Sequence, residues 1–310
     1  MNYQKVMDEL TPVEQHGDML FKRDDLFIPF KDMPLNGGKV RQALSLVYNN
    51  LERIHKEHGG VIATCSSVHS PQGIIVARIA KEFGFKSILG IANPKTDINP
   101  ICEKHYNLKV ARELGCQIEV VAGTGFDQVL QARLKKRYPT AFIISFGMNY
   151  VHDKTSIIDC ISNQTRNIPK DLDNLIVPMG SSITTCGILN GLVENDIPVK
   201  NVWLIQIAGY DRFDKMKSIL QDVNYDKFQF FIKSGSEINT TVRGNVHNIL
   251  SKEFPYTKLV KMKIDNELFL DCIYESKALF HFKNYIKGNG KSLFWIIGNS
   301  SCYFDKEHYA

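Results

Sequence analysis

Short apolar runs rich in β-branched residues recur along this chain, and each is followed by a stretch whose apolar residues repeat with the period of a helix. The runs expected to form strands are Val61–Cys65, Ser87–Ala92, Gln117–Ala122, Ala141–Phe146, Asn174–Met179, Val202–Ala208 and Ser292–Ile297. The stretches expected to form helices are Val40–His58, Gly73–Phe83, Pro100–Leu114, Phe126–Tyr138, Lys154–Asn167, Thr184–Glu194, Phe213–Val223 and Glu275–Lys287. This alternation predicts an α/β fold with parallel sheets covered by helices on both faces. Residues 224–270 show only weak periodicity.

The composition is that of an ordinary globular protein, with 44% hydrophobic and 23% charged residues among 310. The longest apolar runs are strand-sized, so we expect no membrane-spanning segment. The first residues, Met1 to Thr11, are polar and contain no signal-peptide apolar region. Seven cysteines are scattered without a Cys-x-x-Cys pair, which favours reduced thiols and a cytoplasmic location, in the host if the chain is viral. We predict no metal site.

The net charge of +5 is modest, and its clearest cluster is the basic run Arg133–Arg137, late in a predicted helix. Cations near a helix C-terminus on a solvated face explain such a run. A polyanionic partner is the alternative explanation. Charge alone does not decide between them.

Lys39 follows a glycine pair and stands at the start of a long predicted helix. Glycines allow a tight turn and close approach of a ligand, and a helix start leaves N–H groups unpaired. An amine desolvated there can lose its proton near neutral pH and attack a carbonyl carbon. The alternative is a plain surface lysine at a helix start, so other segments must decide.

Three other segments carry candidate chemistry. Residues 66–73, Ser-Ser-Val-His-Ser-Pro-Gln-Gly, follow a predicted strand and are rich in hydroxyl groups that suit an anion such as a carboxylate. Residues 178–187, Pro-Met-Gly-Ser-Ser-Ile-Thr-Thr-Cys-Gly, turn from a strand into a helix and suit a phosphate, although a capped helix start is the plain alternative. Tyr274 and Glu275 open the last long helix and supply an acid–base candidate and a carboxylate.

Together these segments resemble the tryptophan-synthase-β-like, fold type II group of pyridoxal-phosphate enzymes. The nearest branch is similar to 1-aminocyclopropane-1-carboxylate deaminase and D-cysteine desulfhydrase. The matching motifs, in chain order, are Lys-Arg-Asp-Asp-Leu at 22–26, Gly-Gly-Lys-Val-Arg at 37–41, Gly-Ser-Ser-x-Thr-x-x-Gly at 180–187, Asp-x-x-Tyr-Glu-x-Lys-Ala at 271–278 and Leu-Phe-Trp at 293–295. Because they occur in the family's order, the resemblance covers nearly the whole chain.

The resemblance implies pyridoxal 5'-phosphate as cofactor, bound as a Schiff base to Lys39. It implies that the cofactor's phosphate is held by Gly180, Ser181, Ser182, Ile183 and Thr184. Glu275 would lie at the pyridine nitrogen, where a carboxylate favours the protonated ring. Tyr274 and Ser70 join Lys39 as catalytic candidates.

The fold implied by the resemblance has two open, twisted, mostly parallel-sheet lobes with the cofactor in the cleft between them. We expect residues 1–48 and 162–310 to form the large cofactor-binding lobe, and residues 49–161 to form a smaller inserted α/β lobe.

The departures from the family concern the substrate pocket. Pro71 stands where the branch has an asparagine that bonds the cofactor's phenolic oxygen, and a proline side chain has no donor. His69 either substitutes for that asparagine or is a core histidine satisfied by the backbone. Substrate contacts are expected from the same loop, from Ser66, Ser67, Ser70 and Gln72. Near the C-terminus, the family's His-Thr-Gly-Gly is replaced by Ile-Ile-Gly-Asn at 296–299.

Three functions follow from these features. The first is a lyase or deaminase that cleaves a bond at or next to Cα of a small amino acid. The second is a tailoring enzyme that decarboxylates or eliminates from an amino acid attached to thymine, because divergent phage members of this group are associated with hypermodified thymine in DNA. The third is a non-catalytic relative of the fold. The expected partners are a small amino acid or an amino-acid-modified nucleotide or DNA, with a homodimer as the assembly and no membrane.

Overall fold

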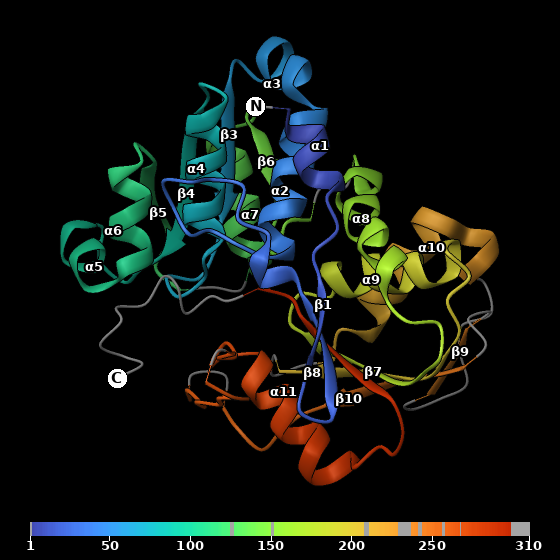
Figure 1. Cartoon of the computed structure of the whole chain (residues 1–310). Coiled ribbons are helices and arrows are strands. Elements are labelled where there is room, and N and C mark those ends of the chain that lie inside the picture. The colour runs from blue at the N-terminus through green and yellow to red at the C-terminus, as the bar shows by residue number, and fades with distance from the viewer. Residues whose placement is uncertain are drawn as a thin grey trace. The chain divides into compact units, whose positions relative to one another are not determined.

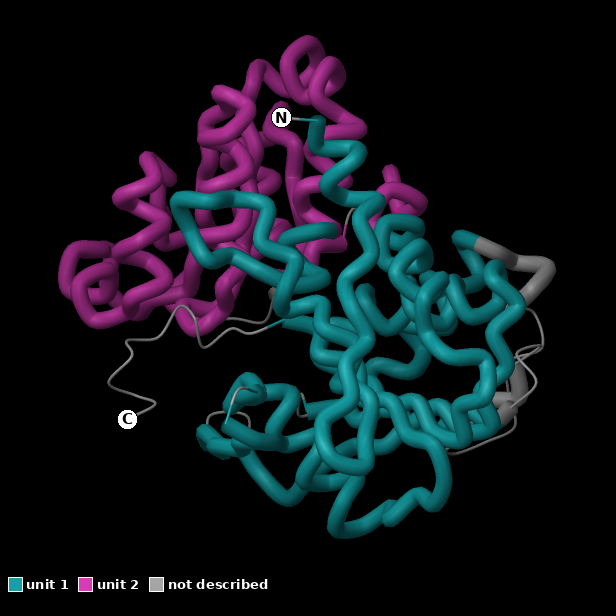
Figure 2. The backbone as a smooth tube through the Cα atoms, in the orientation of Figure 1, with its two compact units in different colours: residues 1–41, 158–310 teal, residues 42–157 magenta. Residues whose placement is uncertain are grey.

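The structure is a computed structural model of the chain, shown in Figure 1. It describes residues 2–124, 127–149, 152–207, 211–228, 237–240, 244–255, 258–266 and 268–298. The chain divides into two compact units (Figure 2): unit 1 consists of residues 1–41 and 158–310, and unit 2 of residues 42–157. The boundaries predicted from the sequence are 48/49 and 161/162.

Unit 2 contains a four-stranded parallel sheet in the order β5-β4-β3-β6. Its strands are β3 (Val61–Cys65), β4 (Lys86–Ala92), β5 (Gln117–Ala122) and β6 (Phe142–Ile144). Its helices are α3 (Leu51–Glu57), α4 (Gln72–Glu82), α5 (Asn99–Lys104), α6 (Tyr106–Glu113) and α7 (Asp127–Arg137), while α2 (Gly38–Asn49) and α8 (Lys154–Ser162) cross the unit boundaries. Helix α7 is mostly polar, but Leu130 and Leu134, four residues apart on one face, pack on the sheet beside Ala63 and Val121.

Unit 1 contains a seven-stranded mixed sheet in the order β1-β2-β11-β7-β8-β10-β9, parallel except for the edge pairs β1·β2 and β9·β10. Its strands are β1 (Val13–His16), β2 (Met19–Arg23), β7 (Leu172–Met179), β8 (Val199–Gln206), β9 (Glu237–Thr240), β10 (Gly244–Leu250) and β11 (Ser292–Ile296). Its helices are α1 (Tyr3–Asp8), α9 (Ile183–Glu194), α10 (Phe213–Phe228) and α11 (Glu275–His281), with short turns η1 (Asp24–Leu26), η2 (Asn163–Asn167) and η3 (Phe282–Ile286).

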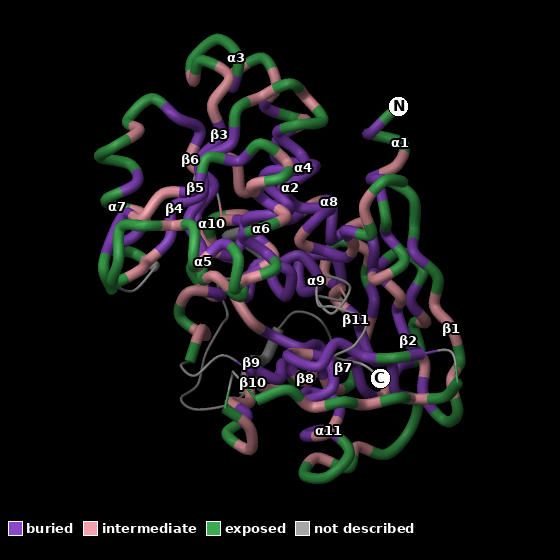
Figure 3. The backbone as a smooth tube through the Cα atoms, turned by 90° about the vertical axis from the view of Figure 1, so that its left-hand side faces the viewer, coloured by how far each residue is buried: buried purple, intermediate pink, exposed green. Residues whose placement is uncertain are grey.

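The central strands of unit 1 are buried on both faces, as Figure 3 shows by colour. Every residue of β11 is buried, and in β7 only Asp173 is partly exposed. A parallel strand covered by helices on both sides needs such a continuous apolar run. On one face, Leu279 of α11 packs with Ile176, Ile205 and Phe294.

The α/β fold with parallel sheets is confirmed, and each of the seven predicted strands is present. Two predicted helices are each split in two. The stretch Val40–His58 breaks at Asn50, whose amide donates to Leu46 O at 2.8 Å and to Asp153 Oδ2 at 2.6 Å, and Pro100–Leu114 breaks at His105. Phe126 and Ala208, which belong to two of the predicted elements, lie outside the described residues.

The motif at 22–26 builds a buried polar network that joins β2, β11 and the N-terminal segment. Asp24 accepts hydrogen bonds from Thr11 Oγ1 at 2.6 Å and from Trp295 Nε1 at 2.9 Å. Lys22 Nζ donates to Thr11 O at 2.6 Å and to Asn167 Oδ1 at 2.7 Å. Two motifs far apart in the chain, at 22–26 and 293–295, are therefore coupled by direct hydrogen bonds.

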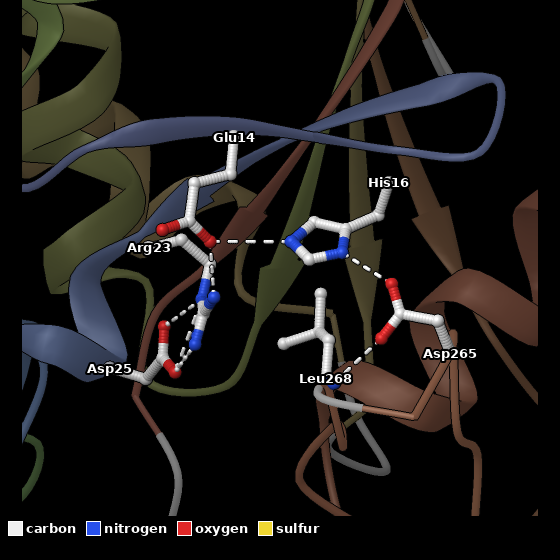
Figure 4. Close-up of polar contacts among 6 residues, drawn as sticks. All are labelled: Glu14, His16, Arg23, Asp25, Asp265 and Leu268. Carbon is white, nitrogen blue, oxygen red and sulfur yellow. Dashed lines mark hydrogen bonds and ion pairs between the residues drawn. The ribbon is translucent and has the colours of Figure 1, made fainter.

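Arg23, which also belongs to the motif at 22–26, lies in a charged cluster at the edge of the sheet (Figure 4). Arg23 pairs with Glu14 and Asp25, and His16 contacts Glu14 and Asp265. Burial opposes protonation of His16, but its hydrogen bonds to Asp265 and Glu14 outweigh this and raise its pKa. The cluster ties the β1–β2 hairpin to Asp265, whose carboxylate accepts the Leu268 N–H at 2.9 Å.

In the described ranges, no helix combines the length and the apolar character needed to cross a lipid bilayer.

We predict that Lys22 makes stability rise with pH in the alkaline range. Burial lowers its pKa from 10.5 to about 8, so between these values the unfolded chain binds more protons than the folded protein. Over this window the thermal midpoint should rise by roughly 5 °C through this group alone. Lys22→Met should remove that rise, whereas Lys31→Met, at an exposed position, should keep it. Parallel pH profiles for Lys22→Met and the unsubstituted protein would contradict the prediction.

Candidate active site

The turn before Lys39 is pressed against the segment that follows β11, and both segments belong to unit 1. The N–H of Gly38 donates to Ile297 O at 2.7 Å. Gly37 has φ +86°, and a Cβ atom built there would lie 2.4 Å from the Cα of Gly298. Only glycine fits this position, because both the conformation and the space exclude a side chain. The following Asn299 lies outside the described residues.

The same turn contacts the predicted phosphate loop. A Cβ atom built on Gly38 would lie 3.1 Å from Thr184 Cγ2, so the two segments touch. A Cβ atom on Gly180 would lie 2.8 Å from Cε1 of Tyr274, so the start of the loop lies under the tyrosine ring. The structure thus brings residues 38, 180, 184 and 274 together within unit 1.

Lys39 is the first side chain of α2 after this glycine turn. Its Nζ lies 6.0 Å from the centre of the Tyr274 ring. The residue is partly exposed, but desolvation of its amine lowers the pKa, and the carboxyls of Asp271 and Glu275 only partly oppose this. A lysine with a lowered pKa has a larger fraction of neutral, nucleophilic amine at neutral pH.

Glu275 is a fully buried carboxyl group at the start of α11. Neither of its oxygens has a hydrogen-bond partner of acceptable geometry among the described residues, although the Asp271 carboxyl lies close enough to interact with it. Burial and then Asp271 raise the pKa of Glu275 well above its usual value. A buried polar group without a partner requires an explanation, and a ligand with a basic nitrogen provides one.

Asp271 fixes the position of both Tyr274 and Glu275. Its Oδ1 accepts the N–H groups of Ile273 at 2.9 Å and of Tyr274 at 2.7 Å, which caps the chain as it enters α11. This aspartate belongs to the motif at 271–278, but the sequence predicted no role for it. An aspartate shortly before the first turn of a predicted helix is the capping pattern that could have identified it.

The predicted phosphate loop leads from β7 into α9. Ser182 has φ +72°, a left-handed conformation that is uncommon outside glycine and that turns the chain into the helix at Ile183. The first N–H groups of a twelve-residue helix point out of this turn, and together with the helix dipole they favour a phosphate group.

The hydroxyl-rich loop at 66–72 belongs to unit 2. The amide of Gln72 is fully engaged there: it donates to Thr64 Oγ1 and Ser145 O and accepts the Gly147 N–H, all at 2.8–2.9 Å. This side chain braces the loop, and its predicted substrate contact would require one of these bonds to break. Ser70 Oγ accepts the Gln72 N–H at 3.3 Å.

Three other members of the loop differ in their exposure. Ser66 Oγ is buried without a hydrogen-bond partner among the described residues, whereas Ser67 and His69 are exposed. The exposure of His69 does not fit a core histidine. The cofactor and substrate roles of these loop residues stay predictions.

The residues of unit 1 fit a phosphorylated pyridine aldehyde. A buried unpartnered carboxyl can face a ring nitrogen, an amine of lowered pKa can hold an aldehyde carbon, and a helix start can hold a phosphate. The arrangement defines a class of proteins, the enzymes that use pyridoxal phosphate.

Comparison with known families agrees with this class. Residues 10–241 match the family model described as pyridoxal-phosphate dependent enzyme. The chain therefore belongs to this family, the fold type II enzymes, and its cofactor is pyridoxal phosphate.

Among curated proteins, the chain is similar to the O-seryl-dTMP PLP-dependent decarboxylase of Salmonella phage ViI. The two are 30% identical over 229 residues, which cover 67% of this chain and 51% of that protein. The chain thus spans about half the length of this relative.

Solved structures share the fold. An ACC deaminase homologue superimposes with a TM-score of 0.71 at 17% identity, covering 98% of this chain and 94% of its own. The O-acetylserine dependent cystathionine β-synthase from Helicobacter pylori gives 0.61 at 14% identity, with 98% of each chain covered.

We predict that Gly37→Ala destabilises unit 1 by about 3 kcal/mol and lowers the cofactor content, because it combines backbone strain with a clash against residue 298. Gly115→Ala is the matched control, since Gly115 has φ +89° and nothing within 4 Å of a built Cβ atom. The control should cost only about 1–2 kcal/mol and retain the cofactor. Thermal midpoints and cofactor absorbance measure both effects, and equal loss in the two variants would refute the clash.

We predict opposite effects of Glu275→Gln on stability and on cofactor binding. Because the folded-state pKa of Glu275 is raised, its contribution to stability is lost as pH rises above 4.5 through that pKa. The neutral isostere should raise the thermal midpoint of the cofactor-free protein at alkaline pH by about 2–5 °C. It should also weaken cofactor binding roughly tenfold, because a charge-assisted contact is lost. Glu194→Gln, at an exposed position, should do neither. A lower midpoint for Glu275→Gln would contradict this account.

Proposed function

We propose that this protein decarboxylates an amino-acid group attached to a thymine nucleotide, with pyridoxal phosphate as cofactor. The observation that carries the proposal is the 30% identity over 229 residues to a decarboxylase whose name specifies O-seryl-dTMP. That likeness in sequence is closer than the 17% identity to the ACC deaminase homologue, which concerns the fold alone. From the sequence alone, this function is the alternative to a lyase or deaminase.

The cofactor-binding residues of the proposal come from unit 1. Lys39 would hold the cofactor covalently through Nζ, residues 180–184 would bind its phosphate, and the Glu275 carboxylate would face its ring nitrogen. When bound, the cofactor supplies an electron sink for the pair of electrons left at Cα when a bond there breaks. A carboxylate facing the ring nitrogen strengthens that sink, because it stabilises the protonated ring.

Decarboxylation breaks the bond between Cα and the carboxylate, releases CO2 and requires a proton at Cα. The Nζ of Lys39 is our candidate donor, because burial lowers its pKa below the usual value for lysine, and a lysine with a lowered pKa gives up its proton more readily. The hydroxyl of Tyr274 is the second candidate, since its ring lies 6.0 Å from that amine. A homodimer and a cytoplasmic location belong to the same proposal.

A lyase or deaminase acting on a small amino acid is the second candidate function. The observation that favours it is the Tyr274–Glu275 pair, which the chain shares with the motif of the deaminase branch. A non-catalytic relative would have no use for a buried unpartnered carboxyl, which is costly to keep.

The proposal predicts CO2 release from O-seryl-dTMP, either as a free nucleotide or within DNA, detected by mass spectrometry of the product. Lys39→Ala should reduce the rate at least roughly a hundredfold, because it removes both the covalent anchor and a proton donor. Lys31→Ala, at an exposed position of the same unit, should leave the rate unchanged. Ammonia and a ketoacid from free amino acids, without CO2 from the nucleotide, would replace this function by the second candidate.

A further inference from the structure

Two histidines of unit 2 follow the carboxyl ends of neighbouring parallel strands. His69 lies in the loop after β3, and His105 lies between α5 and α6, in the connection after β4. Strands β3 and β4 pair in parallel, so their carboxyl ends share one edge of the sheet. Ligands of open parallel sheets bind at this edge.

The two imidazole rings contact each other edge to face. Their centroids are 5.0 Å apart and their planes are inclined by 82°. Within the described ranges neither ring makes a hydrogen bond or ion pair, so its N–H donor is available to a ligand. His69 is exposed and His105 is partly exposed, so solvent and solutes can reach the pair.

The electrostatic surroundings of the pair favour an anion. Burial lowers the pKa of His105, and the like charges of His69 and of Lys104 lower it further. Glu103, the acidic residue beside Lys104, is already paired with Arg112 at 2.5 Å. Three cationic or potentially cationic groups thus lie together, and an anion placed among them would be stabilised by each.

Ser66, at the same edge of the sheet, provides an independent sign of a ligand. The residue is only 1% exposed, yet its Oγ has no hydrogen-bond partner among the described residues. Its backbone N–H donates to Gly90 O at 3.3 Å, so the residue is anchored at the end of β3 beside β4. A buried hydroxyl without a partner is uncommon unless a ligand or water satisfies it.

We propose that His69 and His105, assisted by Lys104, bind the phosphate group of a nucleotide substrate. This inference rests on the proposed function for the identity of the substrate. A phosphate offers several acceptor oxygens and up to two negative charges, which match two imidazole donors and one ammonium group. The cofactor's own phosphate is assigned to residues 180–184 of unit 1, so the two phosphate sites use different residues.

Isothermal titration calorimetry on the cofactor-loaded protein tests the site with thymidine 5'-monophosphate and with thymidine as probes. The monophosphate should bind more tightly than the nucleoside. His105→Gln should weaken binding of the monophosphate about tenfold and leave binding of the nucleoside unchanged, because one charge-assisted hydrogen bond to phosphate is lost. His69→Gln should also weaken binding of the monophosphate about tenfold and leave binding of the nucleoside unchanged. His55→Gln, an exposed histidine elsewhere in unit 2, is the matched control and should change neither affinity.

A thymidine oligonucleotide without terminal phosphate distinguishes the source of the phosphate. Loss of its binding in His105→Gln assigns the site to a phosphodiester of DNA, and loss confined to the monophosphate assigns it to a free nucleotide. The inference is overturned if the monophosphate and the nucleoside bind equally, or if His105→Gln weakens both equally. Phosphate-dependent binding without CO2 release would support the phosphate site and reject the proposed decarboxylase activity. CO2 release with unchanged affinities in the histidine variants would support the decarboxylase activity and reject the phosphate site.

Discussion

The contact between the glycine turn at 37–38 and the segment after β11 is the constraint on which the cofactor site depends. Its backbone hydrogen bond, from Gly38 N–H to Ile297 O at 2.7 Å, joins residues more than half the chain apart. A side chain at Gly37 would separate the two segments, because its Cβ would lie 2.4 Å from the Cα of Gly298. The turn sets where α2 begins, and therefore where Lys39 lies relative to Tyr274 and Thr184.

The second feature of the site is the carboxyl group of Glu275, whose burial lowers the stability of the fold. Among the described residues, Glu275 has no hydrogen bond of acceptable geometry, and it lies buried beside another carboxyl. Burial of an ionised carboxyl destabilises a protein, and we propose that the ring nitrogen of the cofactor pairs with this group. Asp271 has two effects here: its carboxylate accepts a backbone N–H before α11, which stabilises the chain, and it raises the pKa of Glu275.

The predicted site residues are divided between the two units. Unit 1 carries Lys39, residues 180–184 and Glu275, for which we propose contacts with the cofactor. Unit 2 carries the loop at 66–72, where Gln72 is held by three hydrogen bonds, and the connection between α5 and α6 with His105. The departures from the family fall in both units, at Pro71 and at 296–299.

The sequence by itself determined the fold class and the identity of the cofactor, and it predicted which residues hold that cofactor. Buried parallel strands require continuous apolar runs, and helix starts that bind phosphate require small and hydroxylated residues, so both leave local patterns. The strands β1, β2, β9 and β10 were not predicted from periodicity. Of these, β1 and β9 are the short edge strands of the sheet, and edge strands have weaker patterns. The breaks at Asn50 and His105 were also missed.

Only the tertiary structure decided which side chains are engaged and which are available. Nothing local distinguishes Gln72, whose amide is fully bonded, from Ser66, whose hydroxyl has no partner within the described part of the chain, because the partners of Gln72 come from segments distant in the sequence. The pairing of His69 with His105 likewise depends on two neighbouring strands, β3 and β4, that the sequence separates by a whole helix. Local sequence specifies backbone conformation and burial, whereas the set of groups left for a ligand emerges only when distant segments meet.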